Sequence, residues 1–123
     1  MGVKKEPLAL RVRTKDFALR IIRMYRALPK SGEASVIGKQ ILRSGTSVGA
    51  QYREAYRAKS PRDFIRKMEG SLQELDETAF WIELLIEAEI VPEERMSDLA
   101  KETEELIAIF VSSINTAKKN AKR

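Results

Sequence analysis

Hydrophobic residues recur at intervals of three and four along most of this chain, which is the period of an α-helix with one buried face. The pattern predicts helices over residues 15–28, 33–59, 61–88 and 92–118. Short polar connections separate these helices, and connections of this length make successive helices antiparallel neighbours. We therefore expect an all-α fold, an antiparallel up-down-up-down four-helix bundle that forms a single domain over residues 1–123.

The third predicted helix has the clearest start. Ser60 can cap it, Pro61 suits the first helical position, and Asp63 completes an acidic capping box. Its predicted core stripe comprises Phe64, Met68, Leu72, Leu75, Ala79, Ile82 and Ile86.

Small residues fill the middle of the second predicted helix, at Ser44-Gly45-Thr46-Ser47-Val48-Gly49-Ala50. Because they lower helix propensity, close packing against another helix is the plain explanation for them. A phosphate-binding loop is the alternative, but Ala50 stands where the lysine of such a loop should follow the second glycine.

The composition narrows the possible chemistry. The chain has no Cys and no His, the residues most used for general-base and thiol catalysis and for binding zinc. We therefore expect no enzyme activity and no cofactor. Residues 1–14 lack the apolar stretch of a signal peptide, and no apolar run approaches the ~20 residues that span a bilayer. A cytoplasmic protein with no membrane partner is the expectation.

Positive charge is concentrated in the first half of the chain. Residues 1–60 contain 14 Lys/Arg and 4 Asp/Glu, whereas residues 61–90 contain 3 and 8 and residues 91–123 contain 6 of each. A compact protein with one strongly positive region attracts polyanions. This distribution favours binding over catalysis and makes RNA or DNA the expected partner.

The expected nucleic-acid-binding residues lie on the first two helices. Lys39, Arg43, Arg53 and Arg57 share one helical face, and Arg20 and Arg23 are expected to extend the same field, together with Arg11, Arg13 and Lys15. The alternative is that these cations are solvated or paired with acids of the third helix.

The third helix is apolar around most of its circumference at residues 79–86. A bundle normally buries one stripe of each helix, so Phe80, Trp81 and Leu84 are predicted to form a subunit interface anchored by the tryptophan. The alternative is that loops or the segment at residues 7–12 cover them.

Two pairs of carboxylates invite comparison with metal-binding bundles. Glu74 and Glu77 are three residues apart, as are Glu102 and Glu105. Di-metal bundles of this kind use Glu-x-x-His, which this chain lacks. Ion pairs with arginines of the first two helices are therefore the preferred explanation, and no metal site is predicted.

Residues 28–31, 36–55, 58–67 and 77–85 resemble the bacterial four-helix bundle proteins linked to 23S rRNA intervening sequences. The resemblance extends over nearly all the chain from Thr14 onward, and RSGTSVGA at residues 43–50 is its most specific part. It implies a ring-like homopentamer with Arg43, Arg53 and Arg57 on a basic face, and it supplies no catalytic residue. The chain is more distantly similar to accessory variability proteins of diversity-generating retroelements, which implies a reverse transcriptase partner.

One position departs from the resemblance. Ala88-Glu89 stands where an Ala-Gly pair is expected to end the third helix. Because Glu89 tolerates a left-handed backbone poorly, we expect that helix to end differently.

Three functions remain open from the sequence. The leading hypothesis is a non-enzymatic, oligomeric protein that binds RNA or DNA through phosphate contacts without strong sequence choice. The second is an adaptor or accessory subunit whose basic face docks an acidic protein or a polymerase. The third is a metal-dependent enzyme that uses the glutamate pairs.

Overall fold

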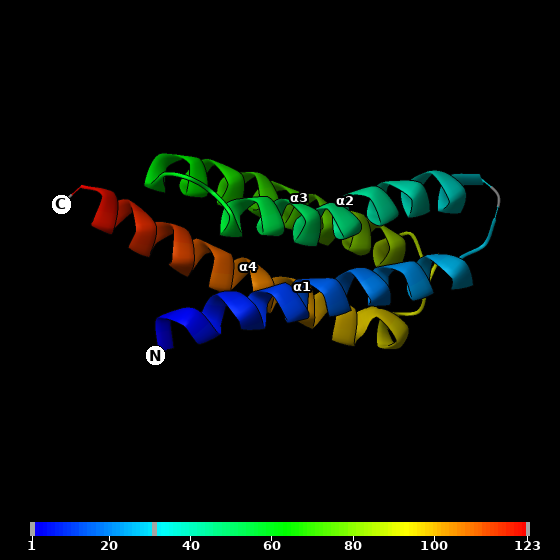
Figure 1. The fold of residues 1–123 in the computed structure, drawn as a ribbon. Helices are drawn as coiled ribbons and strands as arrows, with labels where there is room; N and C mark the ends of the chain where they lie inside the picture. The colour runs from blue at the N-terminus through cyan, green and yellow to red at the C-terminus, as the bar shows by residue number, and fades with distance from the viewer. Residues whose placement is uncertain (1, 31, 123) are drawn as a thin grey trace.

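The computed structural model describes the backbone of residues 2–30 and 32–122, and within them the side chains from Ala9 onward. This part of the chain forms four helices, α1 (Gly2–Ala27), α2 (Gly32–Tyr56), α3 (Pro61–Glu87) and α4 (Glu93–Ala121). They run alternately up and down, so the two chain ends lie at the same end of the bundle (Figure 1). The predicted all-α, antiparallel four-helix bundle is confirmed. None of the described helices has the length and apolar character needed to cross a membrane.

The helices differ in how closely they pack. Helix α2 packs along both α1 and α3, and α3 also packs along α4, whereas α1 and α4 touch only slightly. Figure 1 shows α4 diverging from α1 toward the chain termini. Helices α1 and α3 lie diagonally and make no close backbone approach. The bundle is therefore tightest around α2 and most open between the ends of α1 and α4.

The first helix begins at Gly2, well before the predicted start at residue 15. Leu10 and Thr14 continue the spacing of Phe17 toward the N-terminus, and both are buried. The Thr14 hydroxyl donates to the Leu10 carbonyl at 2.7 Å. Arg11, Arg13, Lys15 and Asp16 stand between these buried positions and obscure the helical period, because they occupy the flanks and the outer side of the same helix.

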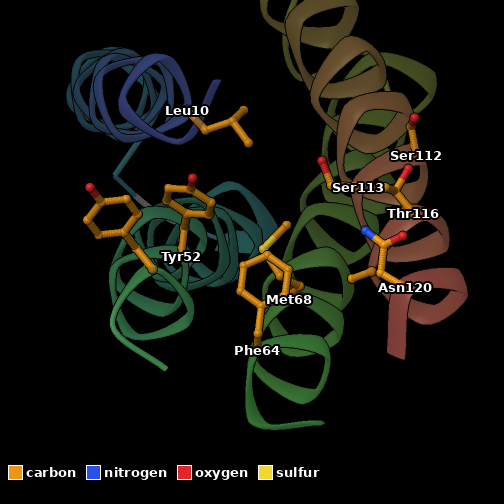
Figure 2. Close-up of a pocket in the computed structure, with 10 residues that line it drawn as sticks. Leu10, Tyr52, Phe64, Met68, Ser112, Ser113, Thr116 and Asn120 are labelled. Carbon is orange, nitrogen blue, oxygen red and sulfur yellow. The ribbon is translucent and has the colours of Figure 1, made fainter. Parts of the chain in front are cut away.

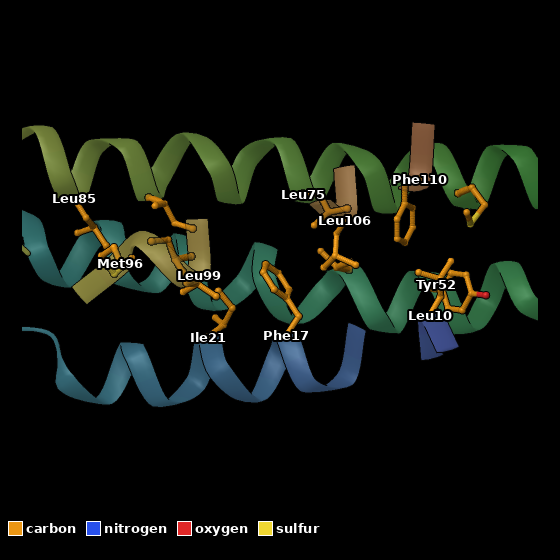
Figure 3. Packing of buried hydrophobic residues seen from close by; sticks show 14 of the residues in the cluster. Leu10, Phe17, Ile21, Tyr52, Leu75, Leu85, Met96, Leu99, Leu106 and Phe110 are labelled. Atoms are coloured by element: carbon orange, nitrogen blue, oxygen red, sulfur yellow. The ribbon is translucent and has the colours of Figure 1, made fainter. Parts of the chain in front are cut away.

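The hydrophobic core runs through the centre of the bundle. Figure 3 shows Phe17 and Ile21 of α1 and Leu106 and Phe110 of α4 directed into one interior. Tyr52 of α2 meets Phe110 edge to face, with ring centroids 5.9 Å apart. Large aromatic and branched side chains of all four helices thus share one buried volume, which provides most of the driving force for folding.

The core stripe of α3 is rotated from the predicted one. Ser71, Thr78 and Leu85 are buried, while Leu72, Ala79 and Ile86 are only partly buried. The Ser71 hydroxyl donates to the Val48 carbonyl at 2.7 Å, and the Thr78 and Ser44 hydroxyls are 2.7 Å apart. These bonds satisfy the buried hydroxyls, so α3 turns its small side toward α2. Hydrophobicity alone does not identify this stripe, because two of its buried members, Ser71 and Thr78, are polar.

Glycines of α2 bring it close to α1. A Cβ at Gly45 would lie 2.7 Å from Ile21 Cγ1, and one at Gly38 would lie 2.9 Å from Leu28 Cδ1. The predicted close helix packing is confirmed. Residues 43–50 lie inside a continuous helix and form no phosphate-binding loop.

Both ends of α3 bear on the sequence predictions. The Asp63 amide donates to Ser60 Oγ at 3.1 Å, so Ser60 caps the N-terminus of α3 as predicted. At the C-terminal end of α3, we expected Glu89 to avoid the left-handed conformation. That expectation was wrong, because Glu89 adopts φ 60°. The Ile90 amide bonds to the Leu85 carbonyl at 3.0 Å, and the Glu89 amide to the Ile86 carbonyl at 3.0 Å. These two bonds form a Schellman motif, which offsets the backbone strain at Glu89.

Candidate nucleic-acid interface

Lys39, Arg53 and Arg57 lie along the outer side of α2 and its C-terminal end, opposite the buried line through Val48 and Tyr52. All three are exposed, and none makes an ion pair with a described residue. At 1.5 Å per residue, Lys39 and Arg57 are roughly 27 Å apart along the helix. This separation spans several phosphates of a nucleic-acid strand.

Arg43 is on the other flank of α2, where acids neutralise it. Its guanidinium bonds to Glu74 at 3.2 Å and also to Glu77, both on α3. Gln51 donates to the same Glu74 carboxylate at 3.3 Å. For this one predicted site residue, pairing with third-helix acids is therefore the correct interpretation.

The predicted site residues Arg20 and Arg23 are on α1, and the ion pairs of a neighbouring arginine indicate where the face of Arg20 is turned. Arg13, which precedes Arg20 by two helical turns, faces α4 and bonds to Glu102 at 2.8 Å and Glu105 at 2.6 Å. Residues two turns apart share a helical face, so Arg20 lies on the α4 side of α1. Arg23, three residues after Arg20, is exposed.

Other cations of α1 lie on its flank toward α2. The Arg11 guanidinium sits over the Tyr56 ring of α2, 5.7 Å from the ring centroid. Lys15 and Arg26 are exposed and lie one turn and about four turns after Arg11, on the same side of the helix. We name the set Arg11, Lys15, Arg26, Lys39, Arg53 and Arg57 the α1–α2 basic face. Arg26 was not among the predicted site residues, although its spacing of three turns from Lys15 could have indicated it.

The glutamate pairs hold arginines. Glu102 and Glu105 bind Arg13 from α4, as Glu74 and Glu77 bind Arg43 from α3. The hydrogen bond with Glu102 raises the pKa of Arg13 above its usual value, which desolvation partly opposes. The predicted ion pairs with arginines of the first two helices are confirmed. Among the described residues, no three acidic, His or Cys side chains converge as a metal site.

The predicted interface residues form an apolar area on α3. Phe80 is 52% exposed, and Trp81 and Leu84 are half-buried. The rings of Phe80 and Trp81 meet at 5.1 Å between centroids, and the buried Trp81 Nε1–H has no hydrogen-bond partner among the described residues. Residues 7–12 belong to α1, whose backbone makes no close approach to that of α3. This packing does not favour the alternative that the segment covers the area.

Comparisons with known proteins agree with the fold. A sequence model described as 23S rRNA-intervening sequence protein matches residues 6–112. A crystal structure of a protein with unknown function from the S23 ribosomal protein family of Bacteroides thetaiotaomicron VPI-5482 is 37% identical, with a TM-score of 0.80. The alignment covers 89% of this chain and 97% of that one. No curated protein matches the chain.

Proposed function

Because this chain belongs to the 23S rRNA-intervening sequence protein family, we propose that it binds RNA or DNA through phosphate contacts on the α1–α2 basic face, without catalysis. The observation that carries the proposal is that exposed Lys39, Arg53 and Arg57 make no ion pair with the part of the chain whose side chains are described. Within that part, acids neutralise Arg43 and Arg13 instead. The family description, which refers to rRNA, supports RNA as the first ligand to test.

The uneven distribution of charge between the two halves of the chain should orient a polyanion on the protein. Residues 1–60, which hold α1 and α2, contain 14 Lys/Arg and 4 Asp/Glu. Residues 61–123, which hold α3 and α4, contain 9 Lys/Arg and 14 Asp/Glu. A polyanion is therefore attracted to one side of the bundle and repelled from the other, which orients it on the basic face before contact.

The test is the salt dependence of binding. If all six cations of the basic face contact phosphates, log affinity should fall against log salt with a slope of about −5. A triple variant, Lys39→Gln with Arg53→Gln and Arg57→Gln, should reduce the steepness of that slope by about 3. Fluorescence anisotropy with a labelled oligonucleotide across a salt series measures both.

A matched control removes the same amount of charge elsewhere. Arg20→Gln, Arg23→Gln and Lys101→Gln change exposed or half-buried cations of α1 and α4. This variant should keep most of the wild-type affinity and slope. An equal loss in both triple variants would mean that only net charge matters, and salt-insensitive binding would refute phosphate contact altogether.

We further propose that the protein works as a homo-oligomer, a pentamer by its resemblance, with Phe80, Trp81 and Leu84 in the subunit contact. Exposed Phe80 supports this proposal, and assembly would repeat the basic face around the particle. Trp81→Ala and Leu84→Glu should each shift the mass measured by light scattering toward the monomer. If both variants keep the wild-type mass, the interface lies elsewhere.

An adaptor or accessory subunit, for example of a reverse transcriptase, is the second candidate function. The same exposed Phe80 favours it, because an aromatic side chain can anchor another protein. Affinity purification from the native host with and without nuclease separates the candidates. A stoichiometric protein partner retained after nuclease treatment would favour the adaptor, and its loss would favour nucleic-acid binding.

A further inference from the structure

A groove opens where α1 and α4 diverge near the chain termini. It encloses about 410 Å³ between Leu10 of α1, Tyr52 and Tyr56 of α2, the start of α3, and the last turns of α4. A second hollow of about 450 Å³ adjoins it, sharing Phe64 and Asn120 as walls, and reaches the α2–α3 turn. Each hollow by itself is within the size range of small-molecule sites.

The two long walls of this groove differ in chemistry. Tyr52 and Phe64 lie on one side, and Ser113, Thr116 and Asn120 of α4 lie on the other (Figure 2). Tyr52 is only 2% exposed and packs against Phe110, so the rings that a ligand can reach are those of half-buried Phe64 and of Tyr56, which is 43% exposed. An aromatic wall facing a polar wall is the arrangement that stacks a nucleobase and hydrogen-bonds its edge.

The polar wall is free to bind a ligand. Elsewhere in the helices, Thr14, Thr46 and Thr103 donate to the carbonyl four residues earlier at 2.6–2.8 Å. Among the described residues, Ser113, Thr116 and Asn120 have no side-chain hydrogen-bond partner. A hydroxyl can donate or accept, and an amide does both, so together they can read the polar edge of a base.

Two cations lie beside the groove, and a third is next to one of its lining residues in the chain. Arg11 lies 5.7 Å over the Tyr56 ring, Arg57 follows Tyr56 in the chain, and Lys59 lines the second hollow. No acidic residue is among the described residues that line either hollow. Arg11 and Arg57 also belong to the α1–α2 basic face. A nucleic-acid strand that lies on that face therefore runs next to the opening of the groove.

We propose that this groove binds an unpaired nucleobase of a strand whose phosphates lie on the α1–α2 basic face. The inference rests on the proposed function and specifies its ligand as single-stranded or locally unpaired nucleic acid. A duplex keeps its bases stacked, so it offers phosphates to the basic face but no base to the groove. The protein should therefore distinguish strands by the presence of accessible bases.

The experiment compares a single strand with an abasic strand of the same length and label, which carries the same phosphates without bases. Fluorescence anisotropy at fixed salt should give the base-containing strand roughly 5- to 150-fold tighter binding, the range for stacking one base. Tyr56→Leu should remove most of this preference and leave the affinity for the abasic strand nearly unchanged. Thr116→Val, which has nearly the same volume, should weaken only the base-containing strand.

Tyr25→Leu is the matched control, because Lys30 lies 5.2 Å over the Tyr25 ring at the other end of α1. It should keep the preference for bases. Equal, salt-sensitive binding of both strands by the wild-type protein would overturn the base-binding groove and leave phosphate binding intact. No binding of either strand would overturn both proposals. If Tyr56→Leu retains the base preference but changes the oligomeric mass, the groove holds a second protein chain and the inference is wrong.

Discussion

Gly45→Ala is the substitution for which the structure makes the sharpest stability prediction. The new Cβ would lie 2.7 Å from Cγ1 and 2.9 Å from Cγ2 of Ile21. Ile21 is completely buried, and its branched Cβ restricts rotation about χ1. The side chain therefore cannot turn away, and α1 must move from α2 to accommodate the methyl group.

Two opposing effects decide the sign of the change. Replacing glycine by alanine inside a helix contributes about 1 kcal/mol through helix propensity. Overpacking a rigid core site costs about 1–3 kcal/mol. Since the clash involves two fixed atoms of a buried side chain, overpacking should win, and Gly45→Ala should lower the free energy of unfolding by about 1 kcal/mol.

Gly70→Ala is the matched control, with the opposite prediction. A Cβ at Gly70 would meet Gln51 Oε1, the far end of a flexible side chain whose amide makes a 3.3 Å bond to Glu74. Gln51 can rotate away at the cost of that one hydrogen bond, so most of the propensity gain remains. Gly70→Ala should raise the free energy of unfolding by about 0.5 kcal/mol.

Urea denaturation followed by circular dichroism, at one protein concentration for all variants, measures both changes. Ile21→Ala removes the clashing atoms, so the double variant with Gly45→Ala should be more stable than additivity predicts by about 1 kcal/mol. The reasoning is wrong if Gly45→Ala is as stable as the wild type, or if the two substitutions are additive.

Two further pairs of substitutions test the end of α3 and the ion pairs. Glu89→Gly should relieve the strain of the left-handed backbone at φ 60°. It should raise the free energy of unfolding by about 1 kcal/mol and the thermal midpoint by about 3 °C. Ala88→Gly, at a neighbouring φ of −82°, should lower it, and a lower midpoint for Glu89→Gly would contradict the strain argument. Arg13→Gln unpairs Glu102, whose side chain is only 16% exposed, and should cost about 1 kcal/mol after allowance for solvent screening. Arg66→Gln breaks a pair in which the arginine is 73% exposed and should cost little, so equal losses in urea denaturation would refute a special role for the Arg13 contact.

The local features of this fold were predictable because neighbouring residues produce them. The spacing of apolar residues predicted four helices, and Ser60 before Pro61 predicted a cap that the structure contains. The small residues around Gly45 predicted a close helix contact. The Glu89 turn was not predictable in the same way, because bonds from Ile90 and Glu89 back into the helix stabilise a conformation that glutamate alone disfavours.

The candidate site depended on tertiary structure to a greater degree. Helical spacing grouped Lys39, Arg43, Arg53 and Arg57, but only the position of α3 decides that Arg43 is neutralised by Glu74 and Glu77. Likewise, only the tertiary structure shows that the face of α1 that carries Arg13 and Arg20 is turned toward α4.

Taken alone, the sequence determined the helices, their antiparallel order and the excess of positive charge in the first half of the chain. These properties depend on periodicity and composition, which are read along one dimension. The tertiary structure decided which cations remain unpaired, how α3 is rotated, and where α1 and α4 separate to leave a groove. Those outcomes depend on which faces of two distant helices meet, because charge neutralisation and packing act through space over a few ångströms.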